Sequence, residues 1–348
     1  MAGSAAGLDT AASTAAVLAA GPVMSTRDAL VLARLDELRP MLDGLPLPAA
    51  GATLRRWRGL AQLGREDLSL ARLAEGHVDA RAILVELGRG DLLEGHGRTG
   101  RLGVWAAEPG RLRAAPSATG WRLTGTKGWC SGSLSVDGAL VTATAPDGPR
   151  LFFVSPADPL ITAEAGSWDP IGMAATRSET LHLDAVAVAP DAEVGRPGAY
   201  VDRPGFGHGG AGVAACWWGG AAGVVDGLRL AVAAGGDDEA AAGLGSAAAD
   251  LEAAWSCLEG AAAEIDAHPL DLAVAARVAS RVRLVVEGAA RRSLDLTVAA
   301  LGAAGLCHDP QHAGRVVDLT VYLSQLRRRP AAAAYGRTLA ADGGWPGW

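Results

Sequence analysis

The first third of the chain carries apolar side chains at helical spacing. Ser25 stands three residues before Asp28, the spacing of a capping box at a helix start, and leucine and valine then recur at intervals that fit one helix face. Pro40, with the prolines that follow it, marks a loop. Two more helices are predicted over residues 54–63 and 78–87.

The middle of the chain changes to a period of two. Near its end, Leu181 and Leu183 would face one side of a strand, and His182 and Asp184 the other. Residues 121–123 and 127–129 flank a predicted turn at residues 124–126. Further short apolar runs lie between turns rich in Pro, Gly and Asp, over residues 139–144 and 151–154. Several short antiparallel strands at this spacing predict a small barrel or sandwich.

Long helical patterns return in the last third. They cover residues 213–234, 245–265 and 270–301. Asp309 followed by Pro310 then suits the start of another helix, with aspartate as N-cap and proline in the first helical position. Four such helices in succession predict a bundle.

This order of helices, strands and long helices predicts an α+β fold. We expect an N-terminal helical domain over residues 1–102 and a central antiparallel β-barrel-like domain over residues 103–204. A C-terminal four-helix-bundle domain would span residues 205–341, followed by a tail over residues 342–348.

The net charge of the chain limits the kinds of molecule that it is expected to bind. The 348 residues carry a formal net charge of −7, with no basic stripe, so nucleic acid is not expected as a partner. The basic run at residues 327–329 is interpreted as a solvated helix end. No long uncharged apolar stretch is present, so no membrane span is expected.

Cysteine usage bears on metals and compartment. The four cysteines are far apart in sequence, and no Cys-x-x-Cys pair occurs, so no zinc site is expected. Scattered single cysteines in an acidic chain fit a reducing cytoplasm. The alanine-rich start of the chain lacks a positive region and contains Asp9, so we interpret it as a tail or short helix.

One short segment has side chains suited to a flavin. In Trp129-Cys130-Ser131, an indole could pack on the flavin ring while a hydroxyl reaches a ring heteroatom. On these three residues alone, the alternative is favoured: a buried tryptophan that ends a strand before a Ser-Gly turn.

The surroundings of this segment resemble the acyl-CoA dehydrogenase family. Ala107-Glu108-Pro109-Gly110 is similar to the family's Thr-Glu-Pro-Gly turn, and residues 121–132 resemble its strand pair with Lys-x-Trp. Residues 168–178 resemble its Gly-Met-Arg-Ala-Thr-x-Ser block, and residues 181–190 look like the strand that follows. The helical segments on both sides also match the family's layout.

The resemblance implies an FAD-dependent oxidoreductase that moves a hydride from a small substrate, such as a CoA- or carrier-bound acyl group, to flavin N5. It also implies a homo- or hetero-oligomer with FAD near a subunit interface. The residues it places at the flavin are Ala106, Ala107, Trp129, Cys130, Ser131, Thr176 and Ser178. Gly302 and Gly305 resemble the glycine turn that, in the family, a neighbouring subunit places against the adenine end; alternatively, they only end a helix.

The sequence departs from the family where the chemistry is expected. The family's catalytic glutamate would fall at Gln325 or Leu326, and its other known place, at residues 212–218, has no carboxylate. The pyrophosphate-binding arginine is also missing, because residues 235–239 are acidic. Arg111 and Arg113 could meet an anion, although solvated side chains are the favoured interpretation.

Histidines are the remaining candidates for a base. His308 and His312 flank the start of the last predicted helix, and His208 lies in a glycine-rich stretch expected to be a flexible loop. The favoured alternative is that Asp309 only caps the helix and both flanking histidines are solvated.

Three functions stay open from the sequence. The first is the flavin dehydrogenase described above, and the second is a flavin-dependent monooxygenase of the same fold. The third is a non-catalytic subunit that assembles with an intact homologue. The missing glutamate and arginine favour the third over a plain dehydrogenase.

Overall fold

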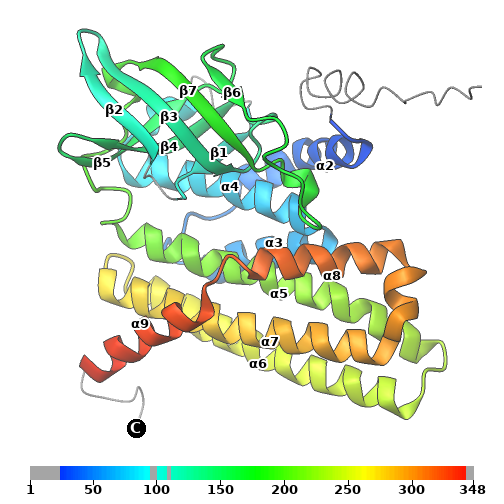
Figure 1. Ribbon diagram of the computed structural model, residues 1–348. Helices are drawn as coiled ribbons and strands as arrows, with labels where there is room; N and C mark the ends of the chain where they lie inside the picture. Colours follow the sequence, from blue (N-terminus) through cyan, green and yellow to red (C-terminus); the bar gives the residue numbers. More distant parts are fainter. Residues whose placement is uncertain (1–23, 95–99, 108–110, 342–348) are drawn as a thin grey trace, which may run out of the picture.

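The computed structural model describes residues 24–94, 100–107 and 111–341. Helices come first, then a β-sheet, then long helices (Figure 1), which confirms the predicted α+β fold. In Figure 1 the sheet lies over α4, and the long helices form layers beneath. No helix in the described part of the chain is long and apolar enough to cross a membrane.

The N-terminal helices are α2 (Thr26–Asp43), α3 (Thr53–Glu66) and α4 (Leu68–Glu86). The capping box is present: the Asp28 backbone N–H donates to Ser25 Oγ, and the Asp28 carboxylate accepts from the Ser25 N–H. The sequence predicted a loop at Pro40, and this prediction was wrong: Pro40 lies inside the last turn of α2. The helix continues because Leu42, only 1% exposed, packs into the core.

Helix α4 begins ten residues before its predicted start at residue 78. Asp67 caps it, with its Oδ1 accepting from the Leu70 N–H at 2.9 Å. The helix is buried on nearly all sides, between the sheet and the other helices. A helix covered on every side has no polar stripe, which is why periodicity detected only its second half.

The central domain is one curled sheet. Its strands are β1 (Leu102–Trp105), β2 (Leu112–Ser117), β3 (Gly120–Cys130), β4 (Gly138–Ala145), β5 (Gly148–Val154), β6 (Ile161–Ala163) and β7 (Glu179–Val188). The order is β1-β4-β2-β3-β7-β6, with β5 paired to β4. The sheet is mixed rather than wholly antiparallel, because β4 runs parallel to both β1 and β2.

Strand β7 has the predicted alternation. Leu181 and Leu183 are buried, whereas His182 and Asp184 are exposed. Two 3-10 turns flank the strand: η3 (Ala174–Thr176) precedes it and η4 (Pro190–Ala192) follows it.

The C-terminal helices are α5 (Pro204–Ala233), α6 (Asp238–Ala267), α7 (Leu272–Cys307), α8 (Pro310–Leu323) and α9 (Arg328–Ala341). The predicted cap of α8 is present, with Asp309 Oδ1 accepting from the His312 N–H at 3.0 Å. Helix α9 was not predicted.

Glycines let α5 lie very close to its neighbours. A Cβ on Gly219 would stand 1.9 Å from the Ala61 carbonyl oxygen, and one on Gly207 would stand 2.7 Å from the Ala275 backbone. The glycine-rich stretch around His208 is therefore helical, and the prediction of a flexible loop was wrong. Close packing against α3 and α7 outweighs the low helix propensity of glycine.

The basic run at residues 327–329 is not wholly a solvated helix end. The Arg328 guanidinium forms an ion pair with the carboxylate of Glu287, a residue on α7 that is fully buried. It also donates to the Leu284 carbonyl at 3.0 Å. A buried carboxylate needs a charged partner, and here α9 supplies one.

Candidate functional site

The end of strand β3 turns Trp129 outward. A break in register lies between Lys127 and Cys130, and Trp129 has a positive φ of 60°. As a result Trp129 is 62% exposed, whereas Cys130 is fully buried. The alternative of a buried tryptophan is thus wrong. The indole meets that of Trp168 edge to face, with ring centroids 6.1 Å apart.

Cys130 faces the other way, into the core of the β-domain. Its thiol donates to the Lys127 carbonyl at 3.2 Å. Burial raises the pKa of Cys130 to about 12, so the thiol stays protonated at neutral pH.

Three hydroxyls beside Trp129 form a row, which we call the hydroxyl row: Thr176, Ser178 and Ser131. The Thr176 hydroxyl donates to the Met173 carbonyl at 2.8 Å. Ser178 Oγ lies 2.8 Å from Thr176 Oγ1 and 2.9 Å from Ser131 Oγ. The Gly132 N–H donates to the Thr176 carbonyl at 2.7 Å and holds the two segments together.

The hydroxyl row has a direction. Each hydroxyl has one proton, and Thr176 uses its own on Met173. Ser178 therefore donates to Thr176, and Ser131 donates to Ser178. The row ends at Ser131 Oγ, which keeps unused lone pairs and is ready to accept from an N–H of a ligand.

Charged groups fix the turn that carries Thr176 and Ser178. Arg177, in the left-handed region with φ of 44°, holds the Glu179 carboxylate through its Nε at 2.7 Å. The Ser133 hydroxyl donates to the same carboxylate. This residue with positive φ is thus held by an ion pair with Glu179 at the start of β7.

The end of β1 reaches the same place. The Trp105 indole N–H donates to the Ser131 carbonyl at 3.0 Å. Ala106, half-buried, and Ala107, exposed, follow directly. The Glu108-Pro109-Gly110 turn lies outside the described residues.

Gly302 and Gly305 lie near the end of α7. Gly302 has φ of 58° and kinks α7, which continues to Cys307, and Gly305 packs beside His312 of α8. This part of the chain forms the end of the bundle, whereas the hydroxyl row lies at the sheet (Figure 1).

The three candidate histidines differ in surroundings. His308 is exposed at the end of α7. His312 is only 4% exposed and faces Gly227 of α5, so the prediction of a solvated side chain was wrong for this residue. His208 is 3% exposed inside α5. Burial lowers the pKa of both His208 and His312, which keeps them neutral at pH 7.

Helix α4 carries ionisable side chains that the sequence analysis missed. Arg72 forms an ion pair with Glu75, and Asp79 accepts from Arg56 at 2.7 Å. Glu75 is 5% exposed, and burial raises its pKa to about 8. The Arg-x-x-Glu-x-x-x-Asp spacing places these side chains on one face of a helix. That spacing was the available signal, but the helix was predicted to begin only at residue 78.

The family's two expected base positions contain no carboxylate. Gln325 is exposed in the turn after α8, and the segment 212–218 is a buried part of α5. Glu75 and Asp79 of α4 nevertheless lie near this part of α5: a Cβ on Gly209 would stand 2.8 Å from Asp79 Oδ2.

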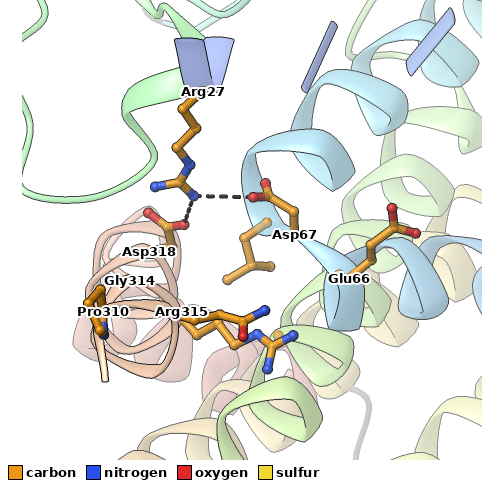
Figure 2. Close-up of a pocket in the computed structure, with 11 residues that line it drawn as sticks. Arg27, Glu66, Asp67, Pro310, Gly314, Arg315 and Asp318 are labelled. Atoms are coloured by element: carbon orange, nitrogen blue, oxygen red, sulfur yellow. Dashed lines mark hydrogen bonds and ion pairs between the residues drawn. The ribbon is translucent and has the colours of Figure 1, made fainter. Parts of the chain in front are cut away.

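A cavity of about 380 Å³ opens between α2, α3, α4, α5 and α8 (Figure 2). Arg27 bridges two carboxylates on its rim, Asp67 at 3.2 Å and Asp318 at 2.6 Å. Asp318 also accepts from the Met173 N–H at 2.5 Å. The cavity therefore borders the segment that leads into the hydroxyl row.

Comparison with known proteins identifies the fold of the chain. No family model matches the chain, and no curated protein matches it. Several solved structures do. TdsC from Paenibacillus sp. A11-2, in a complex with FMN and indole, is 17% identical with a TM-score of 0.76, covering 92% of this chain and 98% of that chain.

Two acyl-CoA dehydrogenases are similar to the same degree. A glutaryl-CoA dehydrogenase in complex with glutaryl-CoA is 16% identical, with a TM-score of 0.73 over 93% of this chain and 97% of that chain. Butyryl-CoA dehydrogenase from Megasphaera elsdenii is 17% identical, with a TM-score of 0.73 over 91% of each chain. The chain thus has the acyl-CoA dehydrogenase fold, as its motifs indicate.

Proposed function

Starting from this fold, we propose that the chain binds a flavin against Trp129 and the hydroxyl row and acts as a flavin-dependent oxidoreductase. One observation carries the proposal. Trp129 turns outward and is 62% exposed, and beside it the hydroxyl row ends at Ser131, whose oxygen has lone pairs free to accept. An exposed indole offers a flat apolar wall, and the pyrimidine edge of a flavin offers an N–H to an acceptor.

The residues that would hold the flavin come from three segments. Trp129 would cover the ring, Ser131 would accept from its pyrimidine edge, and the backbone of Ala106 and Ala107 would border it. Thr176 and Ser178 would orient the Ser131 hydroxyl through the row rather than touch the ring. Bound there, the flavin would supply hydride acceptance at N5. We expect FAD, as in the family that the sequence resembles.

A monooxygenase is the second candidate. Gln325 is exposed, residues 212–218 contain no carboxylate, and TdsC, one of the similar structures, is a dibenzothiophene monooxygenase. A chemistry in which reduced flavin activates oxygen does not need a base at these two positions. Incorporation of labelled oxygen into a product, rather than desaturation, would favour it.

The test is flavin binding by the purified chain. We expect a yellow protein, or an apoprotein that binds FAD in a fluorescence titration, with FMN titrated in parallel. Trp129→Ala and Ser131→Ala should each weaken binding by roughly two- to tenfold, the value of one ring contact or one net hydrogen bond.

Ser256→Ala is the matched control, because Ser256 is an exposed hydroxyl on α6 that donates only to its own helix. It should bind flavin like the parent. A chain that binds neither flavin alone would contradict the proposal, and flavin uptake only with a homologous partner would favour the non-catalytic subunit.

A further inference from the structure

Three buried donors in the helical region have no partner among the described residues. They are the indole N–H of Trp217 on α5, the hydroxyl of Tyr322 on α8 and the Nε of Arg283 on α7. Trp217 and Tyr322 are 0% and 1% exposed. Their rings meet edge to face at 6.2 Å, and the Arg283 guanidinium lies 5.3 Å from the Trp217 ring centroid. We call this group the donor cluster.

Such a cluster is unusual in a folded core. Nearly all buried polar groups make hydrogen bonds, and each one left unmade costs about 1–3 kcal/mol. The Tyr322 hydroxyl contacts the Cys216 thiol, whereas the Trp217 indole N–H and Arg283 Nε have no described acceptor and point to one from outside the chain. A carboxylate suits them, because its two oxygens accept several hydrogen bonds at once.

The charges around the cluster agree with an anion. Asp79 balances the charge of Arg56, whereas Arg72 pairs with Glu75, which burial keeps protonated at pH 7. Arg283 has no ion pair with any described carboxylate. Burial lowers the pKa of Arg283, as expected for a cation that lacks a partner. Positive charge is therefore in excess around the cluster at neutral pH.

The cavity described above lies about one helical turn from the cluster along α5 and α8, and Trp217, Tyr322 and Arg283 do not line it. Its lining residues Leu68, Gly220 and Asp318 stand three or four positions from Arg72, Trp217 and Tyr322 on the same helices. One helical turn is about 5.4 Å. Because side chains tilt toward the N-terminus of their helix, Tyr322 leaves α8 in the direction of Asp318, whereas Trp217 leaves α5 away from Gly220.

Helix α4 also passes close to the hydroxyl row. Leu73, next to Arg72 on α4, comes within 3.3 Å of the position that a Cβ on Gly132 would take. Gly132 follows Ser131 directly. One turn of α4 therefore has the hydroxyl row on one side and the polar side chains on the other.

We infer that the donor cluster binds the carboxylate of a small molecule, with Arg283, Trp217 and Tyr322 donating to its oxygens. Calling this molecule the substrate rests on the proposed flavin function. Binding itself requires no flavin, so the two proposals fail separately.

The test uses the purified full chain and measures its thermal midpoint with acetate, butyrate and benzoate. Acetamide, butyramide and benzamide serve as neutral controls of the same shape. At least one carboxylate should raise Tm in a concentration-dependent manner, because a ligand that binds only the folded state stabilises it. The matching amide should not.

Two variants assign the effect to the cluster. Arg283→Met should weaken carboxylate binding roughly tenfold or more, the value of a charged hydrogen bond, without lowering the Tm of the ligand-free protein. Tyr322→Phe should weaken binding by roughly two- to tenfold. Arg281→Met is the control on the same helix: Arg281 pairs with Glu264 at 2.7 Å, and its loss should leave carboxylate binding unchanged.

The pattern of results separates binding from structure. A merely structural Arg283 would lower Tm when replaced and leave the carboxylate response intact, which would overturn the inference. So would a Tm that none of the three carboxylates raises, or an equal response to the amides. Flavin titration of the same samples reports on the proposed function independently.

Discussion

At the scale of single residues, Glu75 shows how burial decides a protonation state. It is 5% exposed, and its carboxylate pairs with Arg72. Burial nevertheless has the largest effect on its pKa, and the nearby Asp79 adds to it, while Arg72 opposes both. The result is a glutamate with a pKa of about 8.

A pH dependence of stability follows from Glu75. Its usual pKa is 4.5, so between that value and about 8 the folded protein holds a proton that the unfolded chain has released. The contribution of Glu75 to the free energy of unfolding is therefore largest below pH 4.5 and declines as the pH rises toward 8. Glu75→Gln should remove this decline, and urea unfolding at pH 5 and pH 8 should show a difference of about 1–3 kcal/mol from wild type.

Glu252→Gln provides the comparison, because Glu252 is exposed on α6. It should keep the slope of the parent protein. If Glu75→Gln and the parent lose stability equally between the two pH values, Glu75 is already ionised at pH 5.

The local sequence predicted the positions of some residues in the fold but not those of others. The caps at Ser25 and Asp309 depend on neighbours three residues away, and the sequence predicted both. The position of Ser131 beside Ser178 depends on residues 47 apart, and it could be expected only from the family resemblance. Nothing local signals that Arg283 lies over Trp217, because tertiary packing alone brings them together.

At the scale of elements, α5 shows that glycine can mark a crowded helix rather than a loop. The sequence analysis placed a flexible loop around His208 because isolated glycines disfavour helices. In the fold, Gly64 and Gly219 let α3 and α5 approach until backbone meets backbone. Propensity describes an isolated segment, whereas contact between helices is decided by what faces each position.

Two glycine-to-alanine changes should therefore have opposite signs. Gly219→Ala should destabilise the protein by about 1–3 kcal/mol or more, because its Cβ would overlap the Ala61 carbonyl. Gly245→Ala on α6 should stabilise it by about 0.5–1 kcal/mol, since nothing lies within 4 Å and alanine favours helix. Denaturant unfolding measures both, and equal effects would mean that α3 and α5 are not in close contact.

At the scale of the whole molecule, Asp318 joins three distant parts of the chain. From α8 it accepts from Arg27 of α2 at 2.6 Å and from the Met173 N–H before η3 at 2.5 Å. It is 3% exposed, so these bonds are shielded from water. Helix α2, the turn of the hydroxyl row and helix α8 are thus tied at one carboxylate.

Replacing this carboxylate should loosen the turn. Asp318→Asn keeps the shape of the side chain but removes the charge that holds Arg27. We expect the free energy of unfolding to fall by about 1–3 kcal/mol. Hydrogen exchange of residues 171–178 should become faster. Asp295→Asn, at an exposed position of α7, should change neither. Unchanged exchange in Asp318→Asn would show that the turn is held by its own contacts.

The pairing of Arg328 with Glu287 has a consequence for how the chain is made. The two residues are 41 positions apart, so α7 is synthesised with its buried carboxylate paired only to Arg291. At about 5–20 residues per second, Arg328 follows on the order of seconds later. The second ion pair of Glu287 can therefore form only after α9 has been synthesised.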